Sequence, residues 1–261
     1  MATQTTAKFE RLALSHDGAV ARITLRNLPL NVVDIAMMEE LTAALGEIES
    51  RPEISVIVFS GAGNCFSAGV DVTAHIPDKV VCMLEKFHRV IRSLIATSKV
   101  TIAAVRGHCL GGGAELAMVC DLVYTSDDAL WGFPEIHLGC FPPIAATALS
   151  ALIGQKRASD LILTGRTIAG LEAAAIGLAS GSANADRLEQ TVDDTLRRLS
   201  AQSPVALALT KKATYAWDSV HFDKGLARAE KIYLEELMNT EDAQEGIRAF
   251  MEKRQPKWKG R

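Results

Sequence analysis

The N-terminal part of the chain alternates apolar and polar positions in two short runs, FERLAL and AVARITL, on either side of the sequence HDG. A period of two is the pattern of a half-buried strand, and a glycine turn between two such runs predicts a β-hairpin over residues 9–25. The following segment, 33–50, instead places apolar residues from Ile35 to Ile48 at roughly helical spacing. This pattern predicts an amphipathic helix.

Two continuous apolar runs, ISVIVFSG at 54–61 and VTIAAVRG at 100–107, each end in glycine. Short apolar runs that are bounded by turn residues are typical of buried strands. A helical stretch over 79–97 separates them, and LVYTS at 122–126 predicts a further strand. Strands that alternate with helices favour parallel pairing through crossover connections, so the predicted fold class is α/β.

From Pro143 onward the pattern predicts little but helix. The predicted helices span 144–153, 156–163, 171–176, 185–201, 204–216, 222–239 and 241–253. Near 190–200 the composition changes towards charged, amphipathic helices. We therefore divide the chain into a core, 1–195, and a helical region, 196–261.

Composition limits the classes of function. A chain of 261 residues with 48% hydrophobic content buries a substantial core. The 28 Lys and Arg against 31 Asp and Glu give a net charge of −3, which offers no general attraction to nucleic acid. Five cysteines without a CxxC pair favour a reducing cytoplasm. Because we find neither a signal-peptide pattern nor a run of about 18 uncharged apolar residues, we expect a cytoplasmic protein without a membrane segment.

The segment GHCLGGGAELAMVCDL, residues 107–122, carries glycines and one carboxylate among apolar residues. It has no Walker GxxxxGK, and it is no dinucleotide GxGxxG because Leu116 stands at the third glycine position. A strand, a glycine turn and a short helix from Glu115 to Cys120 remain. Glycines let a ligand approach free N–H groups at a helix start, and the loop CFSAGVDV at 65–72 offers a second such turn. These loops predict an oxyanion hole; close helix packing with Glu115 as an ordinary first-turn acid is the alternative.

The segment WGFPEIHLGCFPP, residues 131–143, contains a second carboxylate. Glu135 follows a proline between Phe133 and Ile136, and such apolar neighbours raise the pKa of a carboxyl. Two nearby carboxylates push their pKa values apart, so that one holds a proton while the other accepts one. Glu135 and Glu115 are therefore candidate acid and base, unless Glu135 is a satisfied buried acid or a surface residue.

Several motifs together resemble the crotonase superfamily, the enoyl-CoA hydratase/isomerase family. They are FSAGVD, the run from GHCLGGGAELAMVCDLVY to PEIHLG, LTGRTI and EDAQEGIRAFMEKRQPKWKG, and they span nearly the whole chain. The resemblance implies a spiral core of repeated ββα turns and a helical trimerisation region, in homotrimers or dimers of trimers. It also implies an acyl-CoA thioester substrate, with coenzyme A as part of that substrate and no separate cofactor. No residue spacing resembles a metal site.

The resemblance assigns roles to residues of these motifs. The backbone N–H groups of Val70 and Gly112 would bind the thioester oxygen. Glu115 and Glu135 fall where family hydratases carry their two catalytic glutamates, which orient a water molecule and shuttle its protons. Because many relatives with other activities lack one of the pair, the presence of both favours hydration.

The resemblance further implies contacts to coenzyme A. Ala68 and Asp71 would lie near it, and Phe250 and Lys253 would contribute from a neighbouring subunit. Lys253 also suits a solvated helix end in the basic tail EKRQPKWKGR, and Asp71 suits a cap that braces its loop.

One loop departs from common hydratases, which carry a glycine-rich turn of the form IPGAGG where this chain has FPPIAA, 141–146. Pro143 stands where a glycine amide helps to hold the water, and proline has no N–H. Pro143 either only starts a helix or reshapes the site for another substrate. An FPP loop with both glutamates resembles the cyclohexa-1,5-diene-1-carbonyl-CoA hydratases. Trp131, Phe133 and Phe141 would suit a cyclic substrate, and would equally suit the core.

We therefore expect hydration of an α,β-unsaturated acyl-CoA, with a cyclic dienoyl-CoA of anaerobic aromatic degradation as the substrate. The alternatives on the same scaffold are general short-chain 2-enoyl-CoA hydration, double-bond isomerisation and C–C bond hydrolysis. A relative that binds RNA is a further alternative, but it would need a basic face that a net charge of −3 does not favour.

Overall fold

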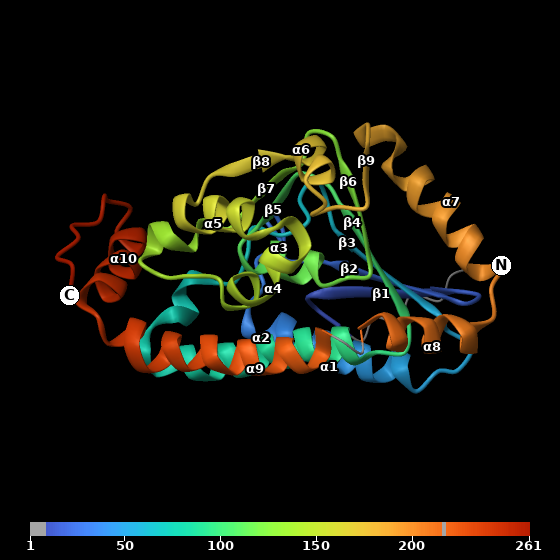
Figure 1. The fold of residues 1–261 in the computed structure, drawn as a ribbon, viewed down its shortest axis with the longest axis horizontal. Coiled ribbons are helices and arrows are strands. Elements are labelled where there is room, and N and C mark those ends of the chain that lie inside the picture. The colour runs from blue at the N-terminus through green and yellow to red at the C-terminus, as the bar shows by residue number, and fades with distance from the viewer. Residues whose placement is uncertain (1–8, 216–217) are drawn as a thin grey trace.

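The computed structural model describes residues 9–215 and 218–261. Two sheets form its centre, with helices packed around them (Figure 1). The larger sheet has the strand order β1 (Leu12–Asp17), β2 (Val20–Leu25), β3 (Val56–Gly61), β4 (Val100–Val105), β6 (Leu122–Ser126) and β9 (Gly181–Ala183). The smaller sheet has the order β5 (His108–Leu110), β7 (Leu130–Gly132) and β8 (Thr167–Ala169).

The pairing confirms the predicted hairpin and the predicted parallel strands. β1 and β2 are antiparallel around a tight turn, with Asp17 opposite Val20. β2, β3, β4, β6 and β9 then pair in parallel, and Val56 lies opposite Val20 on one side and Val100 on the other. From β4 onward the strands form three consecutive pairs, β4 and β5, β6 and β7, and β8 and β9, and each pair places one strand in each sheet. The result is the predicted α/β class.

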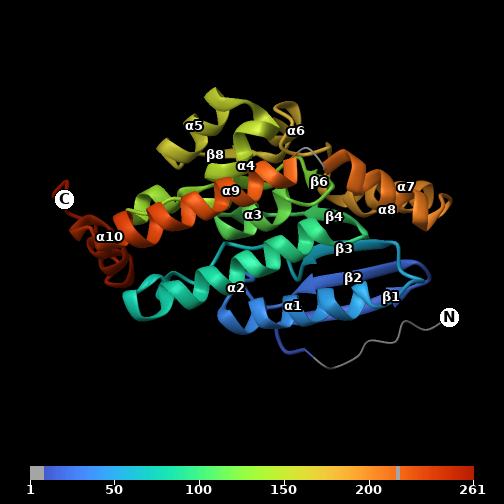
Figure 2. The same ribbon diagram turned by 60° about the horizontal axis from the view of Figure 1, so that its bottom comes forward.

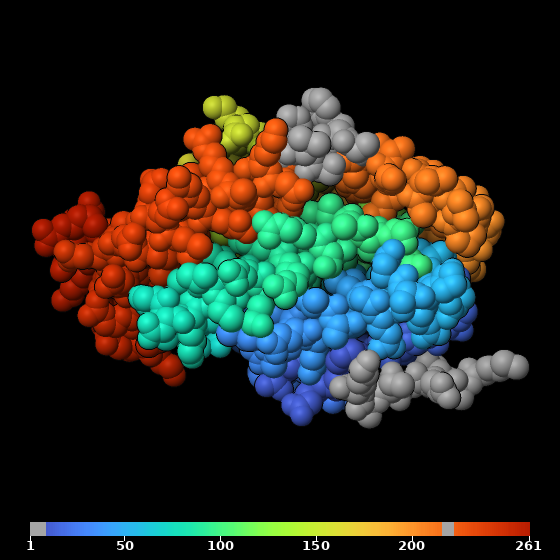
Figure 3. All heavy atoms as spheres, turned by 90° about the horizontal axis from the view of Figure 1, so that it is seen from below, coloured from blue at the N-terminus to red at the C-terminus, as the bar shows by residue number. Residues whose placement is uncertain are grey.

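The described residues form ten α-helices. They are α1 (Ile35–Glu49), α2 (Pro77–Ala96), α3 (Gly112–Met118), α4 (Pro143–Ile153), α5 (Gln155–Thr164), α6 (Gly170–Ala175), α7 (Leu188–Ser200), α8 (Pro204–Tyr215), α9 (Asp218–Lys231) and α10 (Glu241–Met251). Short turns of 3-10 or π helix are η1 (Val72–His75), η2 (Pro134–Leu138), η3 (Ala185–Arg187), η4 (Ile232–Glu236) and η5 (Leu237–Asn239). Figures 2 and 3 show α1, α2 and α9 side by side along one face of the molecule.

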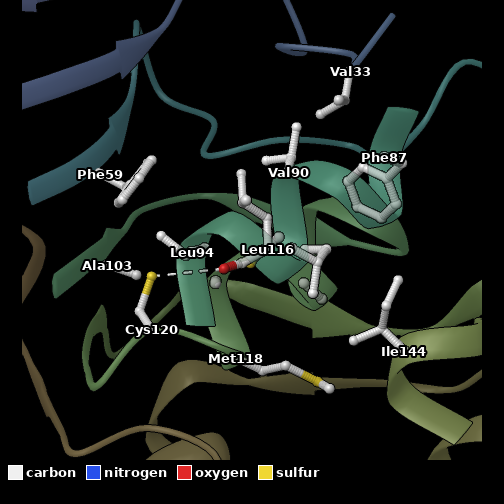
Figure 4. Close-up of a cluster of buried hydrophobic side chains, with 14 of the residues drawn as sticks. Val33, Phe59, Phe87, Val90, Leu94, Ala103, Leu116, Met118, Cys120 and Ile144 are labelled. Atoms are coloured by element: carbon white, nitrogen blue, oxygen red, sulfur yellow. Dashed lines mark hydrogen bonds between the residues drawn. The ribbon is translucent and has the colours of Figure 1, made fainter. Parts of the chain in front are cut away.

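The core holds the short helix α3 in place. Figure 4 shows Phe87, Val90 and Leu94 of α2 near Leu116 of α3, and all four side chains are buried. Burial of each large apolar side chain stabilises the fold by about 1.5–3 kcal/mol. Because Leu116 is anchored in this way, its neighbour Glu115 is fixed as well.

The largest differences from the sequence prediction are short strands. β8 and β9 lie in the region after Pro143 that was expected to be nearly all helix, and each has three residues. A three-residue strand shows too few positions for its period to be recognised. The helix predicted over 222–239 begins at Asp218 and passes into π and 3-10 turns after Lys231. The helix predicted over 204–216 is described to Tyr215, and residue 216 lies outside the described residues.

Helix α7 runs without interruption across the predicted division between 1–195 and 196–261. Helix α9 of the second region packs on α4 of the first. The second region as an oligomerisation unit stays a prediction. Within the described residues, no helix is both long enough and apolar enough to cross a membrane.

Candidate active site

Two loops bring the backbone amides of Val70 and Gly112 together. Val33 N donates to Gly69 O at 2.9 Å and Asp71 N donates to Val33 O at 3.2 Å, so the intervening N–H of Val70 points away from Val33. Gly112 is the first residue of α3, and its N–H has no partner within that helix. A Cβ added to Gly112 would lie 3.4 Å from Val70 N. The two amides are therefore neighbours, and their role as an oxyanion hole stays a prediction.

Gly111 explains why the loop needs glycine before the helix. Its φ is +51°, in the left-handed region that other residues rarely adopt. A Cβ at this position would also lie 2.6 Å from Glu135 Oε1. The glycine thus permits both the turn and the close approach of the second carboxyl.

Glu115 lies in the first turn of α3 and is 3% exposed. Its Oε1 accepts hydrogen bonds from the N–H groups of Ile144 and Ala145, at 2.9 Å each. These donors belong to the start of α4, which Pro143 begins, and the positive end of that helix favours a negative charge. Burial nevertheless raises the pKa of Glu115 above its ordinary value.

Glu135 lies in η2 and has no comparable support. Its Oε2 is buried and has no hydrogen-bond partner among the described residues. Burial, and then the charge of Glu115, raise the pKa of Glu135 above its ordinary value. Because Glu115 has two backbone donors, we infer that it is the more readily ionised carboxyl and that Glu135 retains the proton.

Both carboxyls border a cavity of about 70 Å³. The two glycine loops, α2, η2, the start of α4 and Tyr233 form its walls. Its lining residues are Gly69, Val70, Val72, His75, Met83, Leu84, Phe87, His88, Gly111, Gly112, Glu115, Pro134, Glu135, Leu138, Phe141, Pro142, Pro143 and Tyr233. In the described part of the chain, no group of three or more His, Cys, Asp or Glu side chains is arranged to hold a metal ion.

The predicted substrate-pocket residues divide into two groups. Phe141 and Pro143 line the cavity. Trp131 and Phe133 are fully buried in the core instead, and Trp131 Nε1 donates to Thr125 Oγ1 at 3.0 Å. Trp131 belongs to β7, the central strand of the smaller sheet, and neither Trp131 nor Phe133 is among the residues that line the cavity.

The residues predicted to contact coenzyme A lie outside the cavity wall. Ala68 and Asp71 lie on the loop that leads to η1. Asp71 caps η1 by accepting hydrogen bonds from Thr73 N at 2.9 Å and from Thr73 Oγ1 at 2.8 Å. Phe250, which is 55% exposed, and Lys253 lie at the end of α10. Their contribution from a neighbouring subunit stays a prediction.

Sequence reasoning missed the wall that α2 and Tyr233 contribute. Leu84, Phe87 and His88 all line the cavity from one stripe of α2. The signal was a histidine on the apolar face of a predicted helix, which sequence alone does not distinguish from a core histidine. Tyr233 carried no signal, because its place depends on the path of the chain after α9.

Helix α10 packs closely against the turn that carries Glu135. A Cβ on Gly246 would collide with the backbone carbonyl of Leu138, which cannot give way as a flexible side chain would. We expect Gly246→Ala to lower the free energy of unfolding by about 1–3 kcal/mol through overpacking. It should also reduce the catalytic rate, because η2 must shift. Urea denaturation and a rate assay measure the two effects.

Gly46 in α1 is the matched control, since nothing lies within 4 Å of a Cβ added there. Gly46→Ala is expected to raise the free energy of unfolding by about 0.5–1 kcal/mol. If Gly246→Ala unfolds at the same urea concentration as this control, α10 does not pack tightly against η2 at Gly246, and the prediction is wrong.

Comparisons with known proteins show similarity over nearly the whole chain. The family model described as "Enoyl-CoA hydratase/isomerase" matches residues 15–261. The chain is 36% identical over 250 residues to a cyclohexa-1,5-dienecarbonyl-CoA hydratase of Thauera aromatica, covering 95% of this chain and 96% of the relative. It is 33% identical over 254 residues to a short-chain-enoyl-CoA hydratase of Clostridium acetobutylicum, covering 95% and 97%.

A crystal structure of an enoyl-CoA hydratase from Mycobacterium avium subsp. paratuberculosis has a similar fold. The TM-score is 0.87 at 27% identity, over 96% of this chain and 99% of that one. The sequence motifs, the two sheets and the paired carboxyls are thus accompanied by full-length similarity in both sequence and structure. The chain belongs to the enoyl-CoA hydratase/isomerase family.

Proposed function

We propose that this chain adds water across the double bond of an α,β-unsaturated acyl-CoA. The observation that carries the proposal is the unequal pair of carboxyls on one cavity. Glu115 accepts two backbone hydrogen bonds, whereas Glu135 Oε2 has no partner in the described chain. Hydration needs one group that accepts a proton from water and one that donates a proton to carbon.

The two amides supply the electrostatic part of the mechanism. The thioester oxygen is placed between the N–H groups of Val70 and Gly112, and these donors stabilise the enolate that forms when water adds. Glu115 takes the proton of the attacking water, and Glu135 gives its proton to the α-carbon of the enolate. Removal of one such N–H donor typically lowers the rate by about 10²–10³-fold.

We infer that the acyl group is a cyclic dienoyl group. Phe141, Pro142 and Pro143 give the cavity an apolar wall next to Glu115, without the flexible glycines of common hydratases. The similarity to the Thauera aromatica hydratase supports the same substrate. The nearly equal identity to the Clostridium acetobutylicum relative supports the competing candidate, a short linear enoyl-CoA.

We further infer that the protein works as a trimer or a dimer of trimers. The exposed side chains of Phe250 and Lys253 at the end of α10 would then reach coenzyme A in a neighbouring subunit.

The test is to incubate the purified protein with cyclohexa-1,5-diene-1-carbonyl-CoA and, separately, with crotonyl-CoA. Loss of the conjugated absorbance and gain of the mass of one water report hydration. Faster turnover of the diene supports the cyclic substrate, and turnover of crotonyl-CoA alone makes the protein a short-chain hydratase. If neither thioester gains water, the hydratase proposal is wrong, and isomerase and hydrolase assays follow.

A further inference from the structure

Unpaired buried polar atoms also occur on residues of the cavity wall other than the two carboxyls. Five buried side-chain atoms in the described residues have no hydrogen-bond partner, and three of them belong to residues that line this cavity. They are Glu135 Oε2, His88 Nε2 and Tyr233 Oη. Buried polar atoms are nearly always paired, so a cluster of unpaired ones indicates where a polar ligand group binds.

His88 is held in a defined state by the C-terminal helices. Its side chain is fully buried, and Nδ1 lies 2.6 Å from Glu230 Oε1, which also accepts a hydrogen bond from Arg92 Nη2 at 2.9 Å. Burial lowers the pKa of His88 despite the Glu230 carboxylate, so the ring is neutral near pH 7. A neutral ring that donates from Nδ1 to a carboxylate leaves Nε2 as an acceptor.

Tyr233 lies one turn beyond Glu230, on the same side of the chain as it leaves α9. Its ring packs edge-on against Phe141, with ring centroids 5.2 Å apart, so its position is fixed by an apolar contact rather than by the hydroxyl. The Cys140 thiol lies beside the hydroxyl but is only a weak acceptor, and Oη makes no hydrogen bond of good geometry, so the hydroxyl can donate to a ligand. His88 Nε2 and Tyr233 Oη thus provide an acceptor and a donor in the wall of one cavity, and an alcohol is a ligand group that can use both.

We propose that His88 Nε2 and Tyr233 Oη together bind the hydroxyl group of the hydroxyacyl-CoA product. The hydroxyl donates to His88 and accepts from Tyr233, while Glu230 positions the histidine ring. The pair therefore distinguishes a hydroxyacyl thioester from the saturated thioester of the same length. This inference rests on the proposed hydratase function for the origin of the hydroxyl, but its test requires only binding.

The test measures binding of butyryl-CoA and 3-hydroxybutyryl-CoA, each enantiomer separately, by titration calorimetry. All variants are made in a Glu115→Gln background to suppress turnover. His88→Asn and His88→Gln form a matched pair, because asparagine keeps a polar group near the Nδ1 position and glutamine keeps one near Nε2. We expect His88→Asn to lower the preference for the hydroxylated ligand about tenfold, and His88→Gln to preserve it within about threefold.

Tyr233→Phe removes only the unpaired hydroxyl and keeps the ring contact with Phe141. It should lower the same preference about tenfold without lowering the melting temperature of the free protein, because only a weak contact with the Cys140 thiol is lost. A merely structural role for either residue would weaken both ligands equally, or would lower the melting temperature of Tyr233→Phe. Either result overturns the inference, as does an unchanged preference in His88→Asn.

The hydratase assay is independent of this measurement. A protein that prefers the hydroxylated thioester but hydrates no enoyl-CoA would support the hydroxyl site and contradict the proposed function. A protein that hydrates enoyl-CoA without this preference would support the proposed function and contradict the hydroxyl site.

Discussion

Glu135→Gln is expected to lower kcat for hydration by about 10²–10⁴-fold, because the amide cannot give a proton to the enolate. KM should change little, since the Oε2 of Glu135 makes no hydrogen bond that holds the site together. Initial rates with whichever enoyl-CoA the protein hydrates measure both constants. Circular dichroism spectra of the variant should match those of the wild type.

The pH dependence distinguishes the two carboxyls. If Glu115 acts as the base, the rate falls as the pH drops and this carboxyl becomes protonated. If Glu135 acts as the acid, the rate falls as the pH rises and this carboxyl ionises. The raised pKa values of both groups place these limits above the ordinary range of a carboxyl. In the Glu115→Gln variant the rate should no longer fall at low pH, and in the Glu135→Gln variant it should no longer fall at high pH.

A surface carboxyl serves as the control for these rates. Glu172→Gln, on the exposed side of α6, should leave kcat unchanged within about twofold, as is usual for changes away from a site. Full activity in Glu135→Gln would contradict its role as the acid and return the isomerase and hydrolase alternatives to consideration.

Much of the site could be predicted because its glycines and carboxylates are recognisable in short segments of the sequence. Gly112 and Glu115 are three residues apart on one helix start, so their proximity follows from local geometry. The approach of Glu135 to Gly111 follows from no local rule and was not predicted. Glu135 was a candidate partner of Glu115 because of its apolar neighbours, and the resemblance to a family supported that pairing. The sequence shows which chemistry is present, and the fold decides which groups meet.

Other features depend on side-chain direction or on distant packing. Trp131 and Phe133 belong to one short segment with Glu135, yet they lie in the core whereas Glu135 borders the cavity. A three-residue strand such as β7 gives no period from which the buried face can be read. His88 is 142 residues from its partner Glu230, so only the packing of α9 along α2 brings them together.

Glu135→Gln is also expected to stabilise the protein near neutral pH. Because the folded-state pKa of Glu135 is raised above its ordinary value of 4.5, the folded wild type holds a proton that the unfolded chain releases. The contribution of this proton to the free energy of unfolding is therefore fully present below pH 4.5. It is lost as the pH rises towards the folded-state pKa, by about 1.4 kcal/mol per pH unit at most. Glutamine does not titrate, so the variant should exceed the wild type by about 2–3 kcal/mol at pH 7 and lose this advantage near pH 4.

Urea denaturation of both proteins at several pH values measures this difference, and Glu245→Gln provides a control of opposite sign. The hydrogen bond from Arg254 lowers the pKa of Glu245 to about 2, so this carboxylate stabilises the fold above its unfolded-state pKa and loses the effect as the pH falls towards 2. Glu245→Gln should therefore be less stable than the wild type at pH 7. A Glu135→Gln variant that is also less stable at pH 7 would show that the buried carboxylate has a favourable partner, and the assignment of Glu135 as the protonated member of the pair would be wrong.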